Sequence, residues 1–229
     1  AERTEDNLAV QRLQKLSAEL NVALPVSFYE KDGNVFYNSV AMLDGGKLLG
    51  VYRKTHIPDD HYYQEKFYFT PGNTGFKVFA TQFGNVGVGI CWDQWFPETA
   101  RCLALNGADI ILYPTAIGSE PILSVDSAEH WQRVMQGHSA ANVLPVAAAN
   151  RIGTECVVPC EENGGQTSSL AFYGSSFLTD ATGKIVAGAS REKEQILYAE
   201  YDFAEIERQR REWGLFRDRR PEMYAPIVR

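Results

Sequence analysis

Two apolar runs joined by a short helix-forming segment constrain the fold of this chain more than any other feature. FGNVGVGI (83–90) and DIILYPTA (109–116) are typical of buried strands. PETARCLALNGA (97–108) is typical of a helix, with Pro97 at its first position and Gly107 near its end. A strand, a helix and a strand in this order predict a right-handed β-α-β unit with parallel strands.

The segments on either side of this unit predict hairpins and further helices. Before it we expect a helix capped by Asp6 or Asn7, carrying Leu8, Leu13, Leu16 and Leu20, and strands at 22–28, 35–43 and 48–54. After it we expect helices at 130–143 and 205–213, and strands at 144–150, 173–180, 184–189 and 195–202. The aromatic segment 55–75 is predicted to be an ordered, functional loop. This order predicts an α/β protein with mixed sheets and helices packed outside them.

The composition indicates one large domain or a tight pair of half-domains around one sizeable core, because 45% of the 229 residues are hydrophobic. The formal net charge of -7 argues against nucleic acid or an anionic membrane as a partner. No apolar run is long enough to cross a membrane. We therefore expect a cytoplasmic protein that acts on a small molecule.

Four cysteines are present, at positions 91, 102, 156 and 160, and their spacing suggests no disulfide framework. We expect reduced thiols. The C-x-x-x-C spacing of Cys156 and Cys160 is a weak zinc pattern, since no second pair of ligands follows at a suitable distance. The sequence thus predicts no metal and no organic cofactor.

Cys91 stands where a substrate is expected to bind. It follows the strand at 83–90, and residues 117–120 and Asn150 follow the next two predicted strands. Open α/β sheets bind ligands outside the carboxyl ends of their parallel strands. A sharp strand-to-helix turn can also expose a nucleophile and aim backbone N–H groups at an oxyanion.

Position alone leaves two interpretations of Cys91 open, a catalytic thiol or a buried thiol that only packs. A catalytic thiol needs a neighbour that favours its thiolate at neutral pH. Candidate neighbours are Lys54, His56, His61, Glu65, His130 and His138. A Cys–His pair is a common solution, but spacing does not place any of these histidines beside Cys91.

Four motifs resolve this choice by resemblance. YRKTHIP (52–58), YQEKFYFTPG (63–72), GVGICWDQWFPE (87–98) and PTAIGSEP (114–121) together resemble the carbon–nitrogen hydrolase, or nitrilase, superfamily. The likeness covers nearly the whole chain. It implies one domain over residues 1–229, folded as an α-β-β-α sandwich of two mixed sheets with helices outside, and a homo-oligomer, dimeric or larger.

The resemblance also implies the catalytic roles. Cys91 is the nucleophile, and Lys54 stabilises the tetrahedral oxyanion together with the backbone N–H of Trp92. Glu65 is the additional glutamate that the family places near both groups. The family's general-base glutamate lies upstream of its lysine motif, and no carboxylate before Lys54 stands in that context. We therefore expect that the family's first strands, first helix and that glutamate are missing here, either through N-terminal truncation or because this is a degenerate member, and the intact later motifs favour truncation.

Within the superfamily, the motifs are most similar to members that cleave small carbamoylated amines, which implies a small cationic carbamoyl substrate. Glu120 is the expected partner of the substrate ammonium. Trp92, Trp95 and Trp131 are candidates to line the aliphatic part of the site or to lie over the cation. Trp131 fits a place in the helix-packing core at least as well.

Three alternatives remain open. The first is a related amidase that acts on another ω-amide or on a β-ureido acid, for which a basic residue is expected in place of Glu120. The second is a Cys–His hydrolase or acyltransferase, and the third is a binding protein that retained the pocket without catalysis. The basic stretch 208–220 is either an oligomer contact or a solvated helix face.

Overall fold

The computed structural model describes residues 1–60, 63–119 and 126–228. Its helices are α1 (Leu8–Leu20), α2 (Glu65–Tyr68), α3 (Pro97–Leu105), α4 (Ala128–Asn142) and α5 (Phe203–Trp213), with short 3-10 turns η1 (Thr4–Asp6), η2 (Cys91–Trp95), η3 (Pro221–Met223) and η4 (Ala225–Val228). None of these helices is both long and apolar enough to span a bilayer.

The strands form three sheets among the described residues. The antiparallel sheet contains β1 (Ala23–Asp32), β2 (Val35–Asp44) and β3 (Lys47–Arg53). The central sheet has the order β12-β11-β8-β6-β5-β4, from β4 (Val78–Thr81), β5 (Gly84–Val88), β6 (Ile110–Thr115), β8 (Val146–Asn150), β11 (Phe177–Thr179) and β12 (Ile185–Gly188). The ribbon sheet has the order β7-β10-β9, from β7 (Gly118–Ser119), β9 (Ile152–Cys156) and β10 (Ser169–Tyr173).

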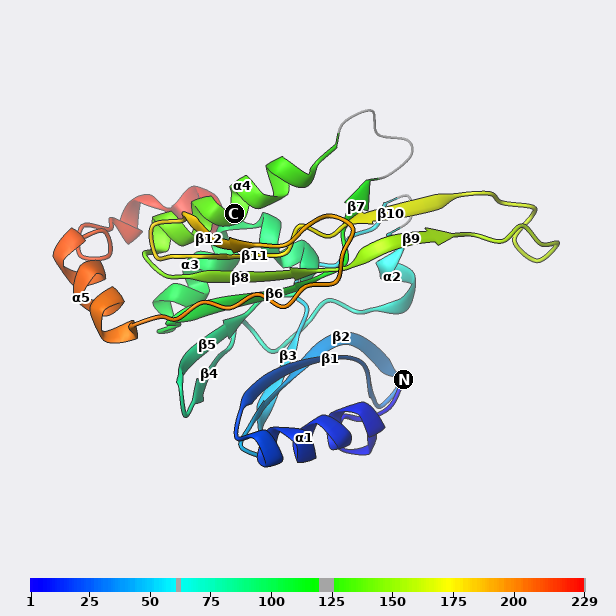
Figure 1. Ribbon diagram of the computed structural model, residues 1–229, viewed down its shortest axis with the longest axis horizontal. Coiled ribbons are helices and arrows are strands. Elements are labelled where there is room, and N and C mark those ends of the chain that lie inside the picture. The colour runs from blue at the N-terminus through cyan, green and yellow to red at the C-terminus, as the bar shows by residue number, and fades with distance from the viewer. Residues whose placement is uncertain (61–62, 120–125, 229) are drawn as a thin grey trace.

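The elements stack in the predicted sandwich, with helices on both outer faces (Figure 1). Helix α1 covers the antiparallel sheet, which lies against the central sheet, and α3 and α4 cover the opposite face of the central sheet. Three apolar clusters fill the interfaces between these layers. The cluster between the two sheets contains Val40, Met42, Tyr52, Phe79, Val86, Val88 and Ile90. Burial of these side chains is what fixes the two sheets relative to each other.

The predicted β-α-β organisation is confirmed. Strand β5 pairs in parallel with β6, and β6 pairs in parallel with β8, while β4, β11 and β12 are antiparallel to their neighbours. The central sheet is therefore mixed. The antiparallel sheet gains one isolated parallel bridge, between Glu2 and Glu30. The carboxyl ends of β5, β6 and β8 meet at one edge of the central sheet, where the site is built.

Helix α1 begins as predicted, but only part of its predicted leucine stripe is buried. The Asn7 side chain accepts hydrogen bonds from the N–H groups of Ala9 and Val10 and so caps the helix. The buried side chains are Val10 and Ser17, and Leu13 packs against the same apolar cluster as Val10, whereas Leu8 and Leu20 are largely exposed. Leucine spacing alone was therefore only a partial guide to the buried face.

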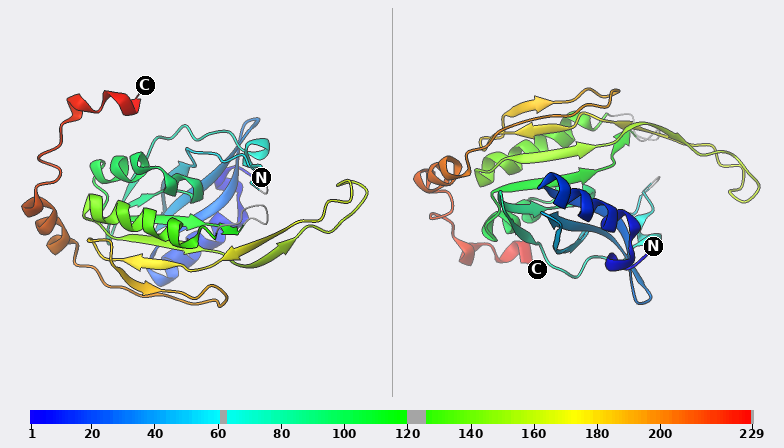
Figure 2. Two further views of the ribbon diagram at one scale, coloured as in Figure 1. Left: turned by 90° about the horizontal axis from the view of Figure 1, so that it is seen from above. Right: turned by 60° about the horizontal axis from the view of Figure 1, so that its bottom comes forward.

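The predicted strand at 195–202 is wrong. This segment forms no strand in the structure, and Ile196 and Tyr198 are exposed. The alternation in its sequence reflects packing on one side only, since Tyr201 reaches back and donates a hydrogen bond to the carbonyl oxygen of Thr179. The predicted strand at 173–180 divides instead into β10 and β11, and β9 and β10 form a long arm that projects from the body (Figure 2).

Candidate active site

Cys91 lies at a sharp turn between β5 and α3. It is the first residue of η2, and its φ of 43° lies in the left-handed region. For a residue with a side chain this conformation costs about 1–2 kcal/mol, so surrounding contacts must hold it. The turn brings the thiol to the carboxyl edge of the central sheet, where its Sγ lies 3.9 Å from the carbonyl oxygen of Ala116, just beyond β6.

Lys54 approaches from the other sheet, directly after β3. Its side chain has no exposed surface, and its ammonium is bound by both carboxylate oxygens of Glu65, at 2.9 Å and 2.7 Å. A buried ammonium requires such a partner, because an isolated charge is costly to remove from water. The Asn38 side chain also donates a hydrogen bond to Glu65, at 3.4 Å.

The loop between β3 and β4 is tied to these residues by backbone hydrogen bonds. Gly72 N–H donates to the carbonyl oxygen of Lys54, at 2.7 Å, and Lys54 N–H donates to the carbonyl oxygen of Asn38, at 2.8 Å. Helix α2 begins at Glu65 within this loop. The part of the predicted functional loop that bears these contacts lies against the antiparallel sheet, and it carries the carboxylate that binds Lys54.

The electrostatic environment of the thiol identifies its neighbours. Burial raises the pKa of Cys91, and the Lys54 ammonium opposes this increase, while the carboxylates of Glu65 and Asp93 reinforce it. Lys54 and Glu65 therefore act on the Cys91 thiol as a charged pair. Cys91 as a residue is half-buried and packs beside the apolar cluster between the two sheets.

The predicted rim of strand ends is present in the described residues. The side chain of Asn150, at the end of β8, accepts a hydrogen bond from Ile117 N–H and donates one to the Ile117 carbonyl oxygen. Ile117 follows β6, and Tyr63 OH accepts a hydrogen bond from Gly118 N–H. Residues that follow three different segments are thereby connected around Cys91.

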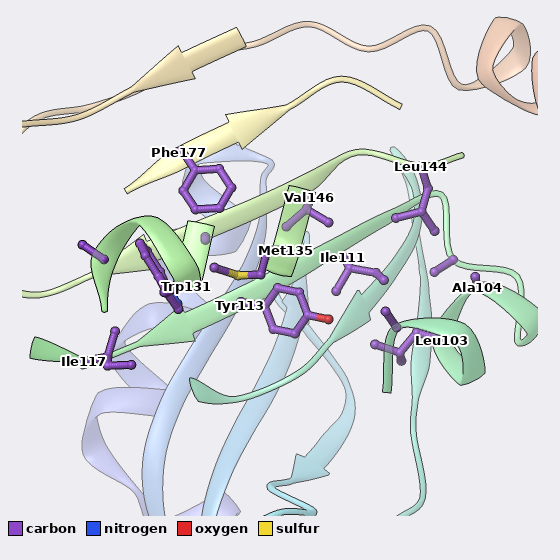
Figure 3. Close-up of a cluster of buried hydrophobic side chains, with 14 of the residues drawn as sticks. Leu103, Ala104, Ile111, Tyr113, Ile117, Trp131, Met135, Leu144, Val146 and Phe177 are labelled. Atoms are coloured by element: carbon purple, nitrogen blue, oxygen red, sulfur yellow. The ribbon is translucent and has the colours of Figure 1, made fainter. Parts of the chain in front are cut away.

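The predicted substrate-binding residues occupy different environments. Glu120 and His61 lie outside the described residues. Trp92 is 37% exposed and packs edge-on against Trp95 beside the thiol. Trp131 instead has no exposed surface and packs in the core between the central sheet and α4, against Phe177 and Tyr173 (Figure 3). The structure places Trp131 in the core because the apolar face of α4 turns toward the central sheet.

The three described histidines have partners other than the thiol. His56 pairs with Asp93, His138 lies with Nε2 at 2.8 Å from the carbonyl oxygen of Gln94, and His130 packs against Trp95. Within the described part of the chain, none of them is hydrogen-bonded to Cys91. This geometry favours a lysine–glutamate environment for the thiol over a Cys–His pair.

Sequence reasoning did not single out two polar residues of the site. Asn38 lies in the middle of β2, and nothing in the strand pattern indicated its contact with Glu65. Asp93 is fully buried two residues after the thiol and accepts several hydrogen bonds. A carboxylate next to a predicted nucleophile was a visible signal, but its partners come from a segment almost forty residues earlier.

The site therefore combines a buried lysine, paired with a glutamate, and a cysteine at the turn after a parallel strand. Comparison with known proteins over the whole chain identifies the class of protein in which this site stands. Residues 1–211 match the carbon–nitrogen hydrolase family, and the chain belongs to that family.

Individual relatives are similar over almost the whole chain. A citrullinase of Francisella tularensis is 59% identical over 99% of this chain and 78% of its own length. An N-carbamoylputrescine amidase of Oryza sativa is 54% identical over 97% of this chain and 73% of its own length. The crystal structure of a carbon–nitrogen hydrolase from Helicobacter pylori superposes with a TM-score of 0.86, at 41% identity, over 95% of this chain and 74% of that one. The fold and the hydrolase class are thereby established.

Proposed function

We propose that this protein hydrolyses N-carbamoylputrescine to putrescine, carbon dioxide and ammonia, a step in polyamine biosynthesis. The observation that carries the proposal is the fully buried Lys54 ammonium, paired with Glu65 and acting on the Cys91 thiol. The identity of 54% to the rice N-carbamoylputrescine amidase supports the choice of substrate. A homo-oligomer, dimeric or larger, is part of the same proposal.

The residues suit attack on a carbonyl carbon that is a poor electrophile. The Cys91 sulfur forms a bond to the ureido carbon, and the C–N bond to the terminal nitrogen breaks, so that ammonia leaves with a proton. Water then displaces the sulfur, and the resulting carbamic acid decomposes to putrescine and carbon dioxide. The Lys54 ammonium stabilises the oxyanion of each tetrahedral intermediate, and one such donor contributes about 3 kcal/mol.

Proton transfer needs a carboxylate beside the thiol. Glu65 meets this requirement through its contact with Lys54, and no carboxylate of residues 1–53, all of which the structure describes, is paired with Lys54. Among the described residues, Glu65 is the carboxylate placed to exchange protons in addition to holding Lys54. We expect this chain to form the S-carbamoyl thioester (a thiocarbamate) on Cys91 with release of one ammonia per adduct, and to complete further turnovers slowly.

Mass spectrometry of the protein mixed with N-carbamoylputrescine tests the proposal. The expected result is a covalent adduct on the peptide that contains Cys91, with slow release of ammonia and putrescine. Cys91→Ala abolishes both, and Cys102→Ala serves as a control that retains them. An adduct on another cysteine, or no adduct with this or any other carbamoyl compound, contradicts the assignment. Ammonia release at a rate normal for an amidase contradicts the expectation about Glu65.

Citrulline is the second candidate substrate, because the Francisella relative of 59% identity is named a citrullinase. Both compounds carry a terminal ureido group, and they differ in the α-carboxylate that citrulline adds beside its amine. Competition between N-carbamoylputrescine, citrulline and a neutral amide for Cys91 separates the candidates. We propose that Glu120 binds the substrate amine, so Glu120→Gln should weaken the cationic substrate far more than the neutral amide. Equal effects on both contradict this role.

A further inference from the structure

Asp93 connects the two segments that carry the catalytic pair. Its carboxylate accepts four hydrogen bonds: from Tyr52 OH at 2.7 Å, Ile90 N–H at 2.9 Å, His56 N–H at 3.0 Å, and His56 Nδ1 at 2.8 Å. Asp93 is fully buried. Ile90 immediately precedes Cys91, and Tyr52 and His56 each lie two residues from Lys54. One carboxylate thus fixes backbone on both sides of the site.

These hydrogen bonds join two different sheets. Tyr52 belongs to β3 of the antiparallel sheet, whereas Asp93 belongs to η2, which follows β5 of the central sheet. The surrounding apolar cluster holds the two sheets together, but hydrophobic burial is non-directional and does not by itself orient individual groups at the site. The hydrogen bonds of Asp93 supply the directional part of this contact.

The surroundings keep this connection in place. Burial, followed by the Asp93 charge, raises the pKa of Tyr52, so its hydroxyl remains a donor. The His56 ring stacks on Phe96 with centroids 3.7 Å apart and planes inclined by 5°, which orients the imidazole. The bond from Ile90 N–H to Asp93 also closes the turn in which Cys91 has its unfavourable positive φ.

We propose that Asp93 is the positioning residue that sets the Cys91 thiol against the Lys54 ammonium, an inference that deepens the proposed hydrolase function. Asp93 acts through backbone and does not touch the thiol or the substrate. Its loss should therefore remove the influence of Lys54 on the thiol as well as destabilise the protein.

The direction in which the apparent pKa of Cys91 changes distinguishes positioning by Asp93 from a simple charge effect. The Asp93 carboxylate by itself raises the pKa of Cys91, whereas Lys54 lowers it. If Asp93 were only a nearby charge, Asp93→Asn would lower the apparent pKa of Cys91. If Asp93 positions the turn, the same substitution separates the thiol from Lys54 and the apparent pKa rises.

The experiment is the pH profile of Cys91 alkylation by iodoacetamide, followed for the Cys91 peptide by mass spectrometry. For Asp93→Asn we expect the midpoint to rise by about one pH unit, a roughly tenfold slower alkylation at neutral pH. Lys54→Met gives the size of the shift for complete loss of the ammonium. Tyr52→Phe removes one hydrogen bond without changing charge and should shift the midpoint upward by less. It decides the matter if Asp93→Asn does not fold.

Glu30 provides a matched control. It is also a buried carboxylate that contacts β3, and it accepts hydrogen bonds from Ser39 Oγ at 2.6 Å and from Arg53 Nε at 2.9 Å. Its hydrogen bonds do not reach η2. Glu30→Gln should lower thermal stability and leave the Cys91 midpoint unchanged. A midpoint that falls or stays constant in Asp93→Asn, or that rises equally in Glu30→Gln, overturns the proposal. Alkylation requires no substrate, so failure to hydrolyse N-carbamoylputrescine does not affect this result.

Discussion

At the scale of single residues, the site is a balance of opposing influences on one thiol. Burial and two carboxylates favour the neutral form of Cys91, and the Lys54 ammonium favours the thiolate. The motifs identified Cys91, Lys54 and Glu65 from the sequence because each stands in a distinctive string of neighbours. Asp93, although visible beside the thiol, and Asn38 were assigned no role, because what matters about them is which groups they contact, and only the folded chain brings those groups together.

The reactivity of Cys91 should therefore depend strongly on pH. Because burial raises the pKa of Cys91 above that of an ordinary thiol, most of the thiol is protonated at neutral pH in the absence of substrate. Alkylation of Cys91 should accelerate as pH increases and reach its midpoint above that of free cysteine, about 8.5. Lys54→Met should move the midpoint further upward. A midpoint below that of free cysteine would mean that Lys54 outweighs burial.

At the scale of secondary-structure elements, most segments with strong hydrophobic periodicity were predicted correctly, whereas some short strands were missed. The hairpins of the antiparallel sheet and the units around β5, β6 and β8 were predicted because apolar runs and Asp-Gly turns bound them. Strand β4, of four residues, was missed, and so was β9, which has no buried residue. Such strands are defined by a partner's backbone and leave little hydrophobic pattern in the sequence.

The loop that carries Glu65 depends on close backbone contact at Gly72. A Cβ at this position would lie 2.1 Å from the carbonyl oxygen of Arg53 and 2.8 Å from that of Lys54. Gly72→Ala must displace the loop from the end of β3, so it should lower the melting temperature and slow thioester formation at Cys91. Gly137→Ala is the control, because nothing lies near a Cβ there, and in helix α4 it should stabilise by about 1 kcal/mol. Unchanged chemistry in Gly72→Ala would show that the loop position does not matter.

At the scale of the whole molecule, the layer order is what the sequence and the family resemblance indicated, whereas the projecting arm of β9 and β10 was not foreseen. The basic stretch 208–220 is largely occupied within the chain. Arg208 pairs with Glu205 and Glu212, and Arg210 donates a hydrogen bond to the carbonyl oxygen of Val143. These contacts favour a role in holding α5 over contact between subunits.

We nevertheless expect a homo-oligomer in solution. Trp213 and Leu215 at the end of α5 are exposed, at 71% and 39%, and apolar side chains of this size are common in subunit contacts. Sedimentation velocity should give a mass of at least two chains of 25.6 kDa. Trp213→Ala should weaken the association if α5 takes part, whereas reversal of the exposed charge at Glu129 on α4 serves as a comparison. A single species of one chain at all concentrations contradicts the expectation.

The proposed nucleophile and the cation lie at the ends of strands in two separate sheets. The rate of catalysis should therefore depend strongly on the relative position of these sheets. A shortened side chain such as Val88→Ala, in the apolar cluster between the two sheets, can shift one sheet relative to the other by a fraction of an ångström. The rate of hydrolysis would fall as a result, while most of the fold remained intact. Denaturant should likewise abolish turnover at a lower concentration than the concentration that unfolds the protein.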